Sequence, residues 1–156
     1  MKSGAREAGS SSNVASLHGA VGRVVHGRGR LCRDQSGAGP GVIVDANTGT
    51  LVTASAPAHV GDTLVIYCNG LGAVTPPIPT GQPAPAGGPL SVTNNPVSIT
   101  IGGIAATVNF AGLAPGFPDL YQVNAVVPPG VSPGTAVPVV LNVAGQTSPT
   151  VTMTVE

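Results

Sequence analysis

The strongest constraint on the fold is a run of alternating apolar residues on both sides of Gly102-Gly103. Apolar side chains stand at every second position before and after this dipeptide: Val97, Ile99, Ile101, Ile104, Ala106, Val108 and Phe110. A period of two is the pattern of a strand with one buried face, and a Gly-Gly pair suits a two-residue hairpin loop. The predicted register pairs Ile101 with Ile104, Ile99 with Ala106 and Val97 with Val108. We therefore expect residues 97–110 to form a hairpin that is central to the core.

Further short runs have strand character and are separated by turn residues: 42–44, 50–53, 63–68, 121–127, 139–143 and 151–155. The segment between the first two runs, Asp45-Ala46-Asn47-Thr48-Gly49, is expected to be a hairpin turn with its glycine in the left-handed conformation. No plausible helix lies between the runs. Such spacing is typical of a Greek-key sandwich, so we expect an all-β, immunoglobulin-like fold of about 7–8 short strands.

A proline- and glycine-rich segment, residues 73–96, interrupts this series of strands. Proline has no backbone N–H and fixes φ near −65°, so it breaks helices and is excluded from central strands. The composition therefore predicts that this segment forms neither a helix nor a central strand.

Charge and proline content both divide the chain near residue 34. All six basic residues lie within residues 1–33, which carry a net charge of +5 because Glu7 is their only acid, and all 16 prolines lie at position 40 or later. The residues from 34 onward carry a net charge of −5 without any Lys or Arg. We predict a disordered basic tail over residues 1–34, either a solvated extension or a stretch foreign to the natural domain, and one sandwich domain over residues 35–156.

The same division limits the partners of the domain. Without Lys or Arg it has no cation to neutralise phosphates, so we expect no nucleic acid partner. The basic residues of the tail would suit a nucleic-acid arm, but no aromatic residues are interleaved with them, and we favour a solvated tail. No stretch has the roughly 18 continuous apolar residues of a membrane span, so we expect no membrane insertion. Residues 1–33 also lack the apolar core of a signal peptide.

Several motifs resemble known families. The segment GDTLVIYCNGLG (residues 61–72) resembles the opening strand and glycine turn of IPT/TIG immunoglobulin-like domains, and residues 97–108 resemble the hairpin that follows it. Residues 36–156 are also similar to the Solibacter-type uncharacterised C-terminal domain family. The motifs that carry this resemblance are GLG (70–72), PTGQ (79–82), FAGLAPG (110–116) and LYQVN (120–124).

The resemblance implies an immunoglobulin-like fold without assigned activity or catalytic residues. It further implies the C-terminal domain of a larger bacterial protein that is secreted or attached to the cell surface, so the expected location is extracellular or cell-surface.

Two residues of the domain were considered for nucleophilic catalysis: Cys68 and His59, the only histidine after residue 34. Strand alternation points Cys68 into a packed layer, so we interpret it as a core residue and His59 as a loop residue. We expect no disulfide between Cys32 and Cys68, because a tail residue would have to reach a buried side chain.

The segment that begins at Asp45 was considered as a calcium loop. An EF-hand requires a ligand at position 5, glycine at position 6 and glutamate at position 12, where this chain has Gly49, Thr50 and Ala56. We therefore expect no catalytic, cofactor-binding or metal-binding residues and no cofactor.

Two functions remain open. One is a non-catalytic structural or adhesive module that packs beside neighbouring extracellular domains. The other is a ligand-binding module that holds a carbohydrate or a protein on loops at one end of the sandwich. We favour the first, because the sequence has no Trp and its Tyr and Phe residues mostly occupy strand or turn positions instead of offering exposed rings to sugars.

Overall fold

The computed structural model of the chain describes residues 39–156, and these residues form an all-β structure with no helix. The predicted tail over residues 1–34, with Cys32, lies outside the described residues. The strands are β1 (Gly39–Pro40), β2 (Ile43–Asp45), β3 (Thr63–Cys68), β4 (Val74–Thr75), β5 (Val92–Thr93), β6 (Val97–Ile101), β7 (Ile104–Leu113), β8 (Tyr121–Val126), β9 (Gly134–Val143), β10 (Gln146–Thr147) and β11 (Val151–Val155).

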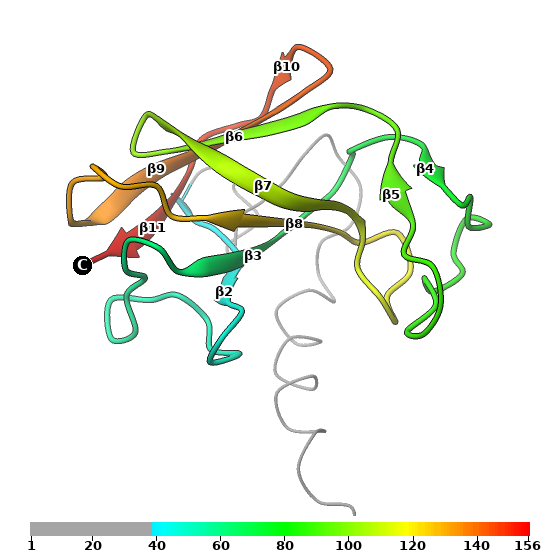
Figure 1. The fold of residues 1–156 in the computed structure, drawn as a ribbon, viewed down its shortest axis with the longest axis horizontal. Coiled ribbons are helices and arrows are strands. Elements are labelled where there is room, and N and C mark those ends of the chain that lie inside the picture. Colours follow the sequence, from blue (N-terminus) through cyan, green and yellow to red (C-terminus); the bar gives the residue numbers. More distant parts are fainter. Residues whose placement is uncertain (1–38) are drawn as a thin grey trace, which may run out of the picture.

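The strands form one mixed sheet whose main path runs β1-β11-β9-β6-β7-β8-β3-β2, with β4, β5 and β10 attached beside it. Neighbours along this path are antiparallel, except that β1 is parallel to β11. The long strand β7 pairs first with β6 and then with β8, so it joins the two halves of the sheet (Figure 1).

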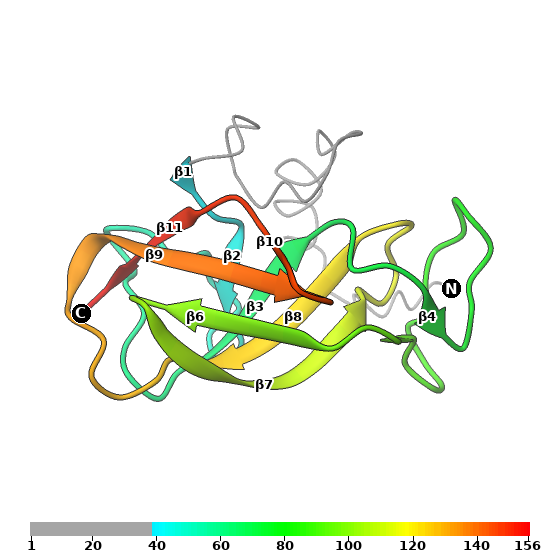
Figure 2. The same cartoon turned by 90° about the horizontal axis from the view of Figure 1, so that it is seen from above.

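The sheet curls because its two ends are tied together by the start of the described chain. Strands β1 and β2 stand at opposite ends of the path, yet only Gly41 and Val42 separate them. The Gly41 N–H donates to the Thr152 carbonyl at 2.9 Å, and the Val42 carbonyl accepts from the Tyr67 N–H at 3.0 Å. The result is a half-barrel of strands around one interior (Figures 1 and 2).

The interior is a single apolar cluster to which both halves of the sheet contribute. Along β3 every second residue is buried, as the alternating sequence predicts, and Leu64 and Ile66 are 0% exposed. From the other half come the fully buried side chains Ile99, Ile101, Val139, Leu141 and Val151. Burial of each such side chain contributes about 1.5–3 kcal/mol, so this shared cluster is the main source of stability.

The predicted hairpin around Gly102-Gly103 forms, but its pairing is shorter than expected. Both glycines have positive φ, 61° and 80°, which suits a type I′ turn. Ile101 pairs with Ile104 and Ile99 with Ala106, as predicted. The third predicted pair, Val97 with Val108, is wrong. β7 leaves β6 after Ala106, and Val108 pairs with Ala125 of β8. Val97 is paired only on the other side of β6, with Val143 of β9.

Two other predicted strands differ from the structure. The turn at residues 45–49 is confirmed, with Gly49 at φ 68°, but the run at 50–53 forms only isolated bridges, such as Val44 with Leu51. Strand β9 begins at Gly134, earlier than the predicted residue 139, because pairing with β11 continues past Pro138.

The proline-rich segment 73–96 extends from the end of the sheet farthest from the C-terminus (Figures 1 and 2). It contains only the two-residue strands β4 and β5, and β5 joins the main sheet through a single pair, Val92 with Gly112. The prediction that this segment forms neither a helix nor a central strand is confirmed. Across residues 39–156 there is no helix with the length and apolarity needed to cross a bilayer.

Candidate functional site

His59 and Asp62 form a small polar loop before β3. The Asp62 carboxylate accepts a hydrogen bond from the His59 N–H at 2.7 Å and lies 3.4 Å from the His59 Nδ1 atom. The Asp62 N–H in turn donates to the His59 carbonyl at 3.1 Å. These contacts close a turn, and the His59 side chain is 61% exposed. His59 is a loop residue, as predicted.

Cys68 stands at the opposite end of β3 from this loop. The six steps from Asp62 to Cys68 span about 20 Å at the rise of an extended strand, so the structure does not bring Cys68 and His59 together. The cysteine is 2% exposed, which confirms its predicted burial, and burial raises the pKa of its thiol to about 12. The thiol is therefore neutral and poorly nucleophilic near neutral pH.

Asp45, the first residue of the segment considered for calcium, is used by its own turn. Its carboxylate accepts from the Asn47 N–H at 2.8 Å, and its carbonyl accepts from the Gly49 N–H at 2.8 Å. Both contacts belong to the hairpin turn that the sequence predicted. No three His, Cys, Asp or Glu residues lie close enough to hold a metal ion in the part of the chain that the structure describes.

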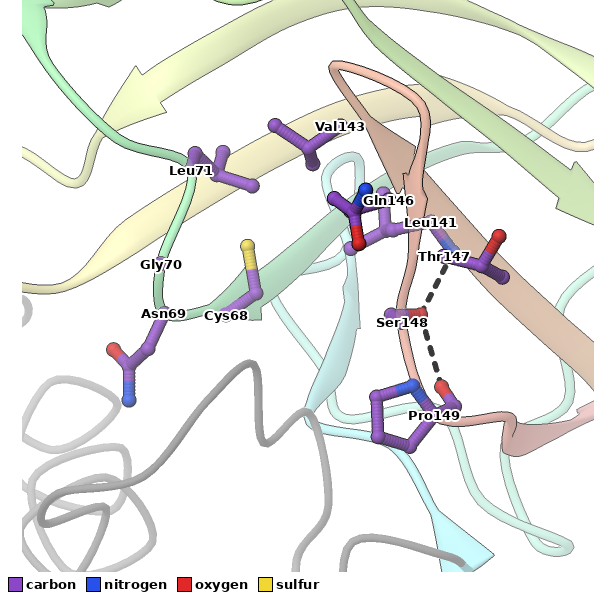
Figure 3. A pocket seen from close by; sticks show the side chains of 10 residues that line it. All are labelled: Cys68, Asn69, Gly70, Leu71, Leu141, Val143, Gln146, Thr147, Ser148 and Pro149. Carbon is purple, nitrogen blue, oxygen red and sulfur yellow. Dashed lines mark hydrogen bonds between the residues drawn. The ribbon is translucent and has the colours of Figure 1, made fainter.

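A pocket of about 490 Å³ opens between the end of β3 and the hairpin of β9 and β10 (Figure 3). Its apolar walls are formed by Cys68, Leu71, Leu141 and Val143. Its polar and turn residues are Asn69, Gly70, Gln146, Thr147, Ser148 and Pro149. In Figure 3 the Cys68 sulfur points into the space between the 69–71 turn and Gln146. The volume falls within the range of about 300–1,000 Å³ that is usual for small-molecule sites.

Most polar atoms at this pocket already have partners. The Ser148 hydroxyl accepts from the Leu141 N–H at 3.0 Å and donates to the Pro149 carbonyl at 2.9 Å. The Thr147 hydroxyl lies 3.4 Å from the Asn142 amide nitrogen. The exposed Gln146 amide has no side-chain partner among residues 39–156, so it is available to a ligand.

The sequence did not point to this pocket, because its walls come from segments about seventy positions apart. One available signal was the turn around Gly145-Gln146 between the alternating runs at 139–143 and 151–155. It placed a tight loop at one end of the expected sandwich but could not show which loop faces it.

A smaller pocket of about 280 Å³ lies between the proline-rich segment and the start of β8. Asp119, at φ 53°, and Tyr121 contribute to its wall. The Tyr121 hydroxyl donates to the Gly72 carbonyl at 2.6 Å, and the pKa of Tyr121 is raised by burial and, to a lesser extent, by the nearby Asp119 carboxylate. The tyrosine therefore keeps its proton and ties Gly72, just before the proline-rich segment, to β8.

Fold and pockets together define an all-β structure with a pocket at one end of a curled sheet, and the residues among 39–156 that line this pocket are uncharged and partly apolar. Comparison of the chain with models of known protein families, with curated proteins and with solved structures gives no match.

Proposed function

We propose that residues 35–156 form a non-catalytic immunoglobulin-like sandwich that serves as a structural or adhesive module. The strand order supports this proposal. Taken in chain order, the strands β2, β3, β6, β7, β8, β9 and β11 receive the letters A to G. One half of the path is then A-B-E-D and the other C-F-G, which is the order of constant-type immunoglobulin domains.

The contacts of three ionisable side chains, Asp45, Asp62 and Cys68, agree with a non-catalytic module. The carboxylates of Asp45 and Asp62 accept hydrogen bonds from backbone N–H groups in the turns next to them. The Cys68 thiol packs in the core. Each of these groups therefore has a structural role. Cys68 and His59, the pair considered for catalysis from the sequence, lie toward opposite ends of β3 and do not meet.

The location and the setting of the module come from the family resemblance. The IPT/TIG-like and Solibacter-type motifs at 61–72, 79–82 and 110–124 suggest the C-terminal domain of a larger secreted or cell-surface bacterial protein. In that setting the partners are neighbouring extracellular domains. A sandwich of this size would separate such domains or end the chain beside them.

A second function, ligand binding, is favoured by the larger pocket. In the lettering above, the 69–71 turn begins the B–C loop and residues 146–149 belong to the F–G loop. These loops lie at the end of the sandwich that carries the antigen-binding loops in antibody variable domains. A carbohydrate or a protein held on these loops is the alternative to a purely structural role.

A glycan array probed with the full chain separates a structural module from a carbohydrate-binding one. A structural or adhesive module without sugar specificity predicts no saturable binding to any glycan. Saturable binding to one glycan class, lost when Gln146→Trp obstructs the pocket and kept in the matched variant Gln82→Trp, would replace the first function with the second.

A further inference from the structure

We propose that the pocket between the 69–71 turn and residues 146–149 binds an uncharged, mainly apolar small molecule. This inference rests on the second candidate function, ligand binding at the loop end of the sandwich. It keeps the loop end of that function as the binding end, but it replaces the carbohydrate or protein with a small, uncharged, mainly apolar ligand.

The lining selects against charge. None of the described residues that line the pocket carries a formal charge near neutral pH, and the Cys68 thiol at its wall is protonated. An ionic ligand would lose water without gaining a counter-charge, and that loss costs several kcal/mol for a buried ion. Residues 39–156 as a whole add only acids, Asp45, Asp62, Asp119 and Glu156, so an anion is disfavoured further.

The apolar walls give an apolar ligand surface to bury. Leu71 and Leu141 are each 2% exposed, and in Figure 3 the side chains of Leu71 and Val143 lie on the same side of the space. Removing apolar area from water favours binding in proportion to the area buried. Sugar recognition usually needs an aromatic ring to stack on, whereas the described lining offers aliphatic and thiol groups.

One end of the ligand meets a polar group. The Gln146 amide stands at the pocket without a side-chain partner among the described residues, so it can donate to a carbonyl or accept from an N–H or O–H of the ligand. The expected ligand therefore has an apolar body and one neutral hydrogen-bonding group.

Two fluorescent dyes with the same ring skeleton test the assignment. N-phenyl-1-naphthylamine is neutral, and 8-anilinonaphthalene-1-sulfonate adds one negative charge. With the full chain at physiological salt, where surface charges are screened beyond about 8 Å, we expect saturable one-to-one binding of the neutral dye. The sulfonate should bind at least tenfold more weakly. Equal binding of the two dyes, or no saturable binding of the neutral one, overturns the assignment.

Matched variants place the dye. Gln146→Trp covers the pocket with an indole ring and should weaken binding of the neutral dye at least tenfold, whereas Gln82→Trp, at the smaller pocket, should leave it unchanged. The reverse pattern would place the dye in the smaller pocket and overturn the proposal. Thermal unfolding shows whether both variants fold.

A second readout does not depend on changing the pocket. In a Cys32→Ser chain Cys68 is the only thiol, and because it is 2% exposed, iodoacetamide should reach it only when this end of the domain opens. The neutral dye, by binding the closed pocket, should slow this alkylation at least threefold. Alkylation at an unchanged rate while the dye is bound would contradict binding at this pocket. Failure of the dye experiments leaves the structural module untouched, since that proposal is tested by the glycan array.

Discussion

The curled sheet and the proline-rich segment 73–96 are held together by different forces. In the sheet, alternate side chains enter one apolar cluster and backbone groups pair along the strands. In the segment, where proline supplies no N–H, backbone pairing is short, and side chains also donate to backbone carbonyls. Ser91 donates to Pro76 at 2.8 Å, and Thr93 and Asn95 both donate to Leu71, at 3.1 and 2.9 Å. A chain poor in backbone donors can therefore still be ordered, but through individual polar contacts.

This difference implies that single substitutions have unequal effects in the two regions. Apolar burial is shared by the whole sheet, so a charge placed there disturbs every strand. Each side-chain hydrogen bond contributes only about 0.5–1.5 kcal/mol. The expected losses of stability are therefore largest in the core of the sheet and smallest at the hydrogen bonds beside the segment.

The largest effect is expected from Ile101→Asp. This side chain is 0% exposed within the shared cluster, so an aspartate there loses water without a partner. We expect a loss of stability on the order of 4 kcal/mol or more, enough to unfold a domain of ordinary stability. Urea unfolding measures the change, and Ser98→Asp, at an exposed position of the same strand, is the matched control. Similar midpoints for both variants would show that β6 is not central to the core.

The next effect tests the contact between the two regions. A Cβ atom added at Gly112 would overlap the Ser91 backbone carbonyl oxygen and approach the Phe110 ring at 2.8 Å. Gly112→Ala should therefore separate β5 from β7 and cost about 1–3 kcal/mol. Gly87→Ala is the control, because a Cβ atom there meets open space. Equal thermal midpoints for the two alanine variants would mean that the segment does not pack on β7 as described.

The pH dependence of stability tests the burial of Cys68. Its thiol has a pKa raised from 9.0 to about 12 in the folded protein, so between these values the unfolded chain releases a proton that the folded chain keeps. The thiol therefore does not lower the free energy of unfolding below pH 9. As pH rises from 9 toward 12, this free energy falls by at most about 1.4 kcal/mol per pH unit.

A Cys68→Ala chain isolates this contribution, because the tyrosines, whose pKa values are also raised, remain in both proteins. With Cys32 replaced by serine in both, chemical unfolding between pH 8 and 10.5 should show a steeper decline for the chain that keeps Cys68. Parallel curves would indicate that the thiol is accessible to water.

The smallest effect is expected from Tyr121→Phe, which removes the hydrogen bond from the tyrosine hydroxyl to the Gly72 carbonyl. The loss should be about 1 kcal/mol. Tyr67→Phe is the control, since the Tyr67 hydroxyl has no hydrogen-bond partner among residues 39–156. If differential scanning calorimetry gives the two variants the same stability, the hydroxyl does not hold the chain at Gly72, next to the segment.

Local patterns in the sequence predicted much of the sheet. Alternation placed the run at 63–68 and the buried face of β6, and the Gly-Gly dipeptide predicted the two-residue loop between β6 and β7. Alternation could not show where β7 stops pairing with β6 and begins to pair with β8. That point depends on residues of β8, which come later in the chain. The predicted pair of Val97 with Val108 was wrong for this reason.

The candidate site was harder to predict than the strands. The burial of Cys68 followed from its strand, and Asp45 was correctly assigned to a turn. The larger pocket depends on how the 69–71 turn faces Gln146, and that arrangement follows from the curl of the whole sheet. Nothing local to either segment encodes it.

Native-state hydrogen exchange tests most directly whether the curled sheet is one cooperative unit with the segment attached to it. The amides of Ile66, Ile99 and Val123, on strands paired on both sides, should exchange only when the whole domain unfolds. The amide of Gln82, in a turn, and the amide of Asn94, beside the short pair of β4 and β5, should exchange roughly 1,000-fold faster. Equal protection in both regions, or fast exchange at Ile66 and Val123, would contradict the account.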